Sequence, residues 1–122
     1  MSLANELEHV GIVGRDRTSL AAAFEATGFC LAPLARHAGG RTGNRCVMLR
    51  DGGYLELMST IDNGSSATLD RFLARHEGAH ILALRIDSED AVLSRLRRVW
   101  DPVPPPPRTH RRVEDDDPHS PR

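Results

Sequence analysis

The sequence predicts an α+β fold built from one complete β-α-β-β-β module and the beginning of a second, incomplete one. Two observations support this prediction. Segments in which apolar and polar residues alternate are interspersed with segments of helical periodicity. The strand and helix at the start of the chain also recur, in the same order, from about residue 77 onward. With 122 residues, the chain has room for one domain.

The first predicted strand is LEHVGIV, in which Val10 and Ile12 share one face and His9 lies on the other. Asp16 or Thr18 can cap the helix that follows, SLAAAFEATG, by accepting backbone N–H groups of its first turn. The expected packed residues of this helix, and the glycine that ends it, are Leu20, Ala23, Phe24, Thr27 and Gly28.

Three further strands complete the module. FCLAPLARH reads as a short strand, in which Pro33 is tolerated only at an edge or a bulge. NRCVMLR and YLELMST read as two strands joined by a hairpin turn at DGG, where glycine supplies positive φ angles. The loop AGGRTG separates the first of these strands from the hairpin.

The second unit starts after a linker. Ser66 can cap the helix ATLDRFLARHEG, AHILALRID reads as a strand, and Asp87 or Ser88 can cap a last helix, EDAVLSRLRRVW. Its expected inward residues are Val92, Leu93, Leu96 and Val99 or Trp100. We therefore expect a domain over residues 5–100, with a first module over 5–61 and a partial second module over 77–100.

Residues 101–122 differ in composition. They hold seven of the eight prolines, and their only aliphatic residues are Val103 and Val113. Such a segment buries too little apolar surface to offset its ordering entropy. Two interpretations stay open: a disordered, partly polyproline II tail, or a sequence not native to the fold, such as a frameshift product.

The charge balance, 16 Lys and Arg against 17 Asp and Glu, gives no basic excess for nucleic acid binding. The apolar runs are too short to span a membrane. Cys30 and Cys46 lack metal-type spacing, so we expect a cytoplasmic protein with reduced thiols.

The motifs HVGIV, YLELM and HILAL, in this order, resemble the vicinal oxygen chelate superfamily over residues 5–98, and RTGNRCVMLRDGGYLELM resembles its glyoxalase-like members. That superfamily includes glyoxalase I, bleomycin-resistance proteins, methylmalonyl-CoA epimerase and extradiol dioxygenases. The resemblance implies two paired modules whose sheets form an open cup. It further implies a divalent ion, such as Mn, Fe, Co, Ni or Zn, that stabilises a developing oxyanion of the substrate.

By this resemblance, His9 and Glu56 occupy ligand positions. Strand parity places Glu56 on the cup face between two helix-facing leucines, where a carboxylate is costly unless it is paired or metal-bound. A structural pairing with Arg45 is the alternative. The matching ligand position in HILAL is Ile81, with His80 on the other face unless a β-bulge turns it inward.

The expected substrate-binding residues are Arg45, Tyr54, Met58 and Arg85, with Glu56 as the catalytic residue. The resemblance implies a lyase, isomerase or dioxygenase that acts on a small oxygenated organic molecule. The alternatives are a non-catalytic sequestering protein of the bleomycin-resistance type and an inactive truncated product. We also expect a homodimer, because an incomplete second module leaves strand edges unpaired.

Overall fold

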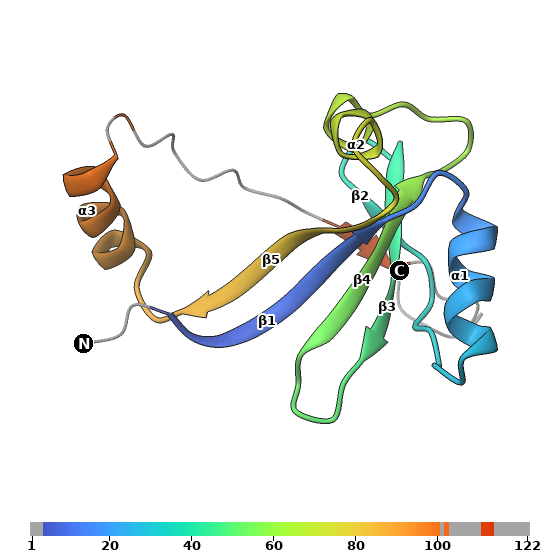
Figure 1. Ribbon diagram of the computed structural model, residues 1–122, viewed down its shortest axis with the longest axis horizontal. Helices are drawn as coiled ribbons and strands as arrows, with labels where there is room; N and C mark the ends of the chain where they lie inside the picture. The colour runs from blue at the N-terminus through green and yellow to red at the C-terminus, as the bar shows by residue number, and fades with distance from the viewer. Residues whose placement is uncertain (1–3, 101, 103–110, 114–122) are drawn as a thin grey trace.

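The computed structural model describes residues 4–100, residue 102 and the backbone of residues 111–113. Its described elements form a six-stranded mixed sheet in the order β5-β1-β4-β3-β2-β6, with three helices (Figure 1). Their bounds are β1 Ala4–Val13, α1 Arg17–Ala26, β2 Ala35–His37, β3 Thr42–Met48, β4 Tyr54–Thr60, α2 Ala67–Leu73, β5 Gly78–Ile86, α3 Glu89–Val99 and β6 Arg111–Val113.

The predicted β-α-β-β-β order and the restart at β5 and α3 are confirmed. The strand expected over residues 29–37 is wrong for its first part, because only Ala35–His37 pairs as β2. Pro33 lacks the N–H that a ladder requires. Ala32 instead donates its backbone N–H to the carbonyl of Cys46 at 2.8 Å, which holds the irregular segment beside β3.

Strand β1 is an interior strand of the sheet, between the edge strand β5 and β4. It pairs in parallel with β4, with His9 opposite Tyr54, and antiparallel with β5, with His9 opposite Ala83. Three register shifts interrupt the β1–β5 ladder, and such bulges increase strand twist. The two strands extend together beyond the rest of the sheet and curve away from it (Figure 1).

The core lies where α2 meets the ends of β1 and β4. Leu69 and Leu73 of α2 pack on Val13 and Met58, all at most 8% exposed. Burial of such side chains contributes about 1.5–3 kcal/mol each. Ser66 caps α2 as expected, accepting the backbone N–H of Leu69 at 3.2 Å. Helix α2 therefore closes one end of the sheet face that carries Met58.

Two expectations from the sequence concern α3 and the segment that follows it. The helix α3 forms with Ser88 as its cap, but none of its residues is buried, and Val99 is 84% exposed. The expectation that its apolar side chains point inward is therefore wrong for Leu96, Val99 and Trp100, which are exposed, whereas Val92 and Leu93 are half-buried. The helix α3 leaves the end of β5 without turning back over the sheet (Figure 1). In the expected tail, Arg111–Val113 pairs with β2 as β6; residues 101, 103–110 and 114–122 lie outside the described residues.

Asp16 is the N-cap of α1, and it is one of the two residues predicted for this position. Its carboxylate accepts the Ser19 hydroxyl at 2.8 Å and the Thr18 backbone N–H at 3.1 Å. These hydrogen bonds, the one from Ser19 first, hold the pKa of Asp16 below its ordinary value of 3.8. The ionised cap therefore stabilises the fold at pH values above the unfolded pKa, and this stabilisation is lost as the pH falls through the lower folded pKa.

The variant Asp16→Asn retains a cap but cannot ionise. We expect the wild-type protein to be the more stable of the two at about pH 6, and the difference in urea midpoint to vanish at about pH 2. Urea unfolding of both proteins across this range measures it. A difference that stays constant with pH would contradict the assignment.

Candidate functional site

Glu56 lies near the middle of the sheet, on the face opposite Leu55 and Leu57. Its partners across the ladders are Gly11 in β1 and Cys46 in β3. We call this side of the sheet the Glu56 face. A β-carbon at Gly11 would lie 2.8 Å from Cβ of Ile81, so glycine permits the close packing of β5 on this face.

A chain of hydrogen bonds holds Glu56. The Asn44 amide, in a residue that is 2% exposed, donates from Nδ2 to Glu56 Oε2 at 2.7 Å and to His37 Nε2 at 3.1 Å. Because a carboxylate accepts, the amide nitrogen must face Glu56, and His37 Nε2 must then accept as well. His37 therefore carries its hydrogen on Nδ1 and donates it to Thr42 Oγ1 at 2.8 Å. The other carboxylate oxygen, Glu56 Oε1, takes part in none of these hydrogen bonds.

His9 lies on the same face, one strand away. Its ring stacks on Tyr54, with centroids 4.7 Å apart and planes 12° apart. Nδ1 of His9 is buried and has no hydrogen bond within the described residues, although Glu8 Oε1 lies 3.4 Å from it. Since Tyr54 is directly opposite His9 and two residues before Glu56, the histidine and the carboxylate are diagonal neighbours on the sheet.

A small apolar pocket of about 120 Å³ opens beside Tyr54, and neither His9 nor Glu56 is among the residues that line it. Asn44 and Tyr54 contribute its polar groups, and the residues that line it are Ala32, Pro33, Ala35, Asn44, Cys46, Met48 and Tyr54. The pocket is therefore bounded by the irregular segment before β2 and by β3 and β4. Apolar pockets with a few converging polar groups are typical binding sites for small molecules.

The β5 strand contains the bulge that would be needed to turn His80 inward. Ile81 pairs with Gly11 while Ala79 pairs with the next β1 residue, Ile12, which leaves His80 as the extra residue. The His80 side chain nevertheless contacts Phe72 and His76. Its ring stacks between Phe72 and His76, at 4.8 Å and 4.1 Å, and its Nε2 donates to the His76 carbonyl at 2.8 Å.

The donor set does not fit a divalent metal ion. Catalytic metal sites usually have three protein ligands, whereas the Glu56 face offers His9 and Glu56, with Ile81 in the third position. Among the described residues, no group of three or more His, Cys, Asp or Glu could hold an ion. One oxygen of Glu56 is also taken by Asn44.

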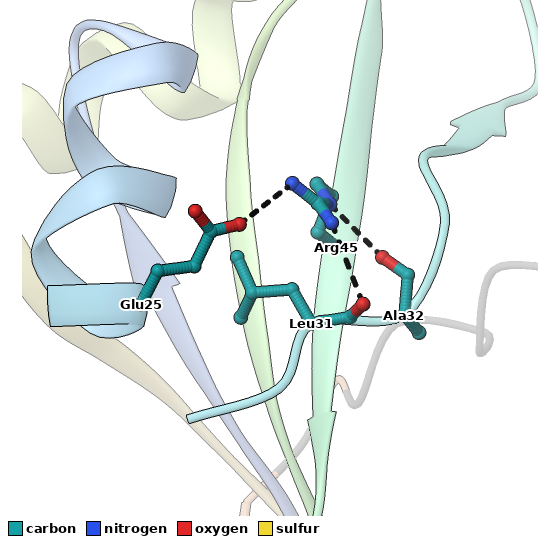
Figure 2. Close-up of polar contacts among 4 residues, drawn as sticks. All are labelled: Glu25, Leu31, Ala32 and Arg45. Atoms are coloured by element: carbon teal, nitrogen blue, oxygen red, sulfur yellow. Dashed lines mark hydrogen bonds and ion pairs between the residues drawn. The ribbon is translucent and has the colours of Figure 1, made fainter. Parts of the chain in front are cut away.

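Arg45 lies on the other face of the sheet, the side that α1 covers. Its guanidinium donates to the carbonyls of Ala32 and Leu31 at 2.9 and 3.4 Å and pairs with Glu25 at 3.3 Å (Figure 2). The structure therefore brings Arg45 neither to the pocket nor to Glu56. The alternative that Glu56 pairs with Arg45 is therefore wrong, because the carboxylate that pairs with Arg45 is Glu25.

The other predicted substrate-binding residues are dispersed. Tyr54 lines the pocket. Met58 lies on the Glu56 face but is covered by α2 and is 6% exposed. Arg85 is exposed near the far end of β5, where it pairs with Glu6 at 3.3 Å. The residues brought together are thus His9, Tyr54 and Glu56.

Sequence reasoning missed Asn44 and gave His37 no defined role. The signal was present in the hairpin. Once the DGG turn fixes the register, Cys46 is opposite Glu56 and Asn44 is opposite Met58, so Asn44 faces the same side as Glu56 by strand parity. Only the tertiary placement of β2 beside β3 brings His37 to Asn44.

Comparisons with known proteins bear on the fold and the family. A family model described as a glyoxalase-like domain matches residues 7–119. Methylmalonyl-CoA epimerase from Mycobacterium tuberculosis has a similar structure, with a TM-score of 0.63 and 25% identity, over 80% of this chain and 66% of that one. Among curated proteins, none matches the sequence significantly.

Two further solved structures show the same fold. A hypothetical protein from Bacillus halodurans C-125 matches with a TM-score of 0.63 and 16% identity, over 77% of this chain and 67% of that one. Streptomyces coelicolor methylmalonyl-CoA epimerase, in complex with 2-nitronate-propionyl-CoA, matches at 0.60 and 21%, over 79% and 72%. The chain thus spans about two thirds of the length of the Mycobacterium tuberculosis and Bacillus halodurans proteins. Together with the β-α-β-β-β order, the match over residues 7–119 shows that the chain belongs to the glyoxalase-like domain family, within the vicinal oxygen chelate superfamily.

Proposed function

We propose that the protein binds a small oxygenated organic molecule on the Glu56 face and that Glu56 removes a proton from a carbon next to a carbonyl group. The observation that carries this proposal is the placement of Glu56. Its carboxylate is half-buried, it is held through one oxygen by a buried amide, and it forms no ion pair with a cation among the described residues. A fixed carboxylate with one oxygen outside the network is suited to act as a general base.

The pocket supports a substrate with a small apolar group. At about 120 Å³ it takes a few heavy atoms, given that a water molecule occupies about 30 Å³ in the liquid. Tyr54 and Asn44 lie at its wall and give it its polar side. The similarity to the Mycobacterium tuberculosis epimerase favours isomerase chemistry, because inversion at a carbon beside a thioester carbonyl proceeds by removal and return of a proton.

His9 is proposed as the second polar group of the site. Its ring is fixed by Tyr54 and its buried Nδ1 has no hydrogen bond within the described residues. We propose that its ring holds or donates a proton to the substrate oxygen that gains negative charge when the proton leaves. Since the donor set does not fit a metal ion, no step of this proposal passes through one.

Exchange of substrate hydrogen with solvent tests the proposal. The full chain is incubated in deuterium oxide with methylmalonyl-CoA, and deuterium at the carbon between the two carbonyl groups is followed by mass spectrometry. We expect uptake faster than in buffer alone. Thermal-shift binding without uptake would instead support the second candidate, a sequestering protein, which the apolar lining of the pocket favours. Neither binding nor uptake with methylmalonyl-CoA and a panel of short carbonyl compounds would contradict both.

We also propose that the protein is a homodimer. A single chain supplies one wall of a cup, since its described strands form one sheet, and β5 lies at an edge of that sheet. Exposed edges of this kind are normally covered or paired. Static light scattering of the full chain measures the mass directly, and a stable monomer at high concentration would contradict the dimer.

A further inference from the structure

A row of polar side chains crosses the Glu56 face from β2 to β4. It consists of Thr42, His37, Asn44 and Glu56, joined in that order by hydrogen bonds of 2.8, 3.1 and 2.7 Å. Strand parity places them together, because Ala35 of β2 is opposite Asn44 of β3 and His37 lies two residues beyond Ala35. The proposed reaction uses the Glu56 end of this row, and His37 lies two hydrogen bonds away from it.

The glycine loop between β2 and β3 holds His37 against Thr42. Gly40 donates its backbone N–H to the His37 carbonyl at 3.0 Å, which closes a tight turn. Gly39, at the third position of this turn, has a φ of 90°, in the left-handed region that glycine adopts without strain. The chain therefore reverses at once and returns as β3, so that the Thr42 hydroxyl becomes the partner of His37 Nδ1.

Burial makes the amide of Asn44 dependent on both of its acceptors. The residue is 2% exposed, and a buried amide hydrogen that loses its acceptor is costly. One hydrogen on Nδ2 points to Glu56 Oε2 and the other to His37 Nε2, which uses both donors of the group. Its Oδ1 accepts from Cys46 Sγ at 3.6 Å. Each of the two acceptors therefore holds the amide in the orientation that the other one requires.

We infer that His37 is a positioning residue for Glu56. This inference rests on the proposed function, in which Glu56 is the general base, and it names what holds that base in place. A hydrogen on His37 Nε2 would meet the donating amide of Asn44, and the amide would have to turn its oxygen toward the ring. That oxygen would then lie against the Glu56 carboxylate, where two acceptors repel each other. His37 therefore holds Glu56 only with its hydrogen on Nδ1.

Thr42 acts one hydrogen bond further away, through His37. A neutral imidazole can carry its hydrogen on either nitrogen, and the partner of one nitrogen decides which form is present. The Thr42 hydroxyl accepts from Nδ1 at 2.8 Å and so keeps Nε2 free to accept from Asn44. Removal of this hydroxyl should therefore loosen Glu56 without any change in the residues that contact it.

Deuterium uptake by His37 variants, measured over a range of methylmalonyl-CoA concentrations, tests the inference. His37→Leu fills a similar volume without an acceptor and should lower kcat about 10²-fold, the cost of misplacing a reacting group, with KM little changed. His37→Gln can bring its side-chain oxygen near the position of Nε2 and should restore kcat to within about fivefold of the wild-type value. Unchanged kcat in His37→Leu, or a loss that His37→Gln does not rescue, would overturn the inference.

A matched pair at Thr42 tests the tautomer. Thr42→Val keeps the branched shape and removes the hydroxyl, and it should lower kcat at least about fivefold, the factor that one neutral hydrogen bond is worth. Thr42→Ser keeps the hydroxyl and should react as fast as the wild-type protein. Equal rates in the two variants would show that the hydroxyl does not fix His37. Circular dichroism checks that every variant is folded.

Nitrogen NMR of the full-length wild-type protein gives a readout that does not depend on activity. Couplings between ring nitrogens and carbon-bound hydrogens show which nitrogen carries the hydrogen, and the His37 signals are identified by their loss in His37→Gln. We expect hydrogen on Nδ1 at about pH 8, and hydrogen on Nε2 would overturn the inference. Absence of uptake by the wild-type protein would overturn the proposed function and the positioning role together, whereas uptake that persists in His37→Leu would overturn the positioning role alone.

Discussion

Turnover by the Glu56→Gln variant is expected to fall about 10²–10⁴-fold, the usual contribution of a positioned general base. Glutamine has the same shape, and its side-chain oxygen can still accept the Asn44 amide that now bonds Glu56 at 2.7 Å. It cannot accept a proton at the operating pH. The geometry and binding should therefore survive while proton removal is lost. The measurement is the initial rate of deuterium uptake, compared with the wild-type protein at equal occupancy.

Glu25→Gln is the matched control for this prediction. Glu25 is an exposed carboxylate on the opposite side of the sheet, where it pairs with Arg45 (Figure 2). Its neutralisation should leave deuterium uptake unchanged, since surface ion pairs contribute little to stability. Equal uptake by Glu56→Gln and the wild-type protein would remove Glu56 from the reaction.

The second large effect is on stability. The variant Asn44→Ala should lower the free energy of unfolding by about 3 kcal/mol, because a buried hydrogen-bonding group left unpaired costs about 1–3 kcal/mol. The Asn44 amide bonds both Glu56 and His37 and accepts from Cys46 Sγ at 3.6 Å. Its removal leaves these groups without this partner. Urea unfolding at neutral pH measures the loss.

Asn44→Asp tests whether the amide hydrogens are the cause. This substitution keeps the volume but places a second carboxylate against Glu56, since Asn44 Nδ2 is 2.7 Å from Glu56 Oε2. Two adjacent carboxylates cannot both remain ionised without cost. The deficit of Asn44→Asp relative to the wild-type protein should therefore shrink as the pH falls, whereas that of Asn44→Ala should not. Equal deficits at all pH values would show that volume alone matters at this position.

Local patterns were sufficient to predict most elements of the fold. Alternation in LEHVGIV and YLELMST, the glycines of DGG and the caps Asp16, Ser66 and Ser88 all correspond to observed features. Helical periodicity also predicted α3, but not whether anything covers it. Burial depends on what the connection at Asp87 allows, and this information is tertiary.

The candidate site was predictable in its strands and not in its contacts. Parity placed Glu56, His9 and Tyr54 on one face. The hairpin register that places Asn44 on the Glu56 face places Arg45 on the opposite face. The partners of Arg45, however, are carbonyl groups of an irregular segment that no pattern predicted. His80 shows the same limit, because its bulge could be anticipated while its stacking on Phe72 could not.

The position of β1 between β5 and β4 has a consequence for how the chain reaches its native state. Strand β1 precedes both of its partners in the sequence, since His9 pairs with Tyr54 on one side and Ala83 on the other, so these ladders cannot form until much of the chain has followed. Contacts between residues that are distant in sequence slow folding, because the entropy of closing the intervening loop is lost before the contacts stabilise the structure. The β3–β4 hairpin, with its tight turn, is local by comparison. We expect it to form early during refolding, and the addition of β1 and β5 to limit the rate.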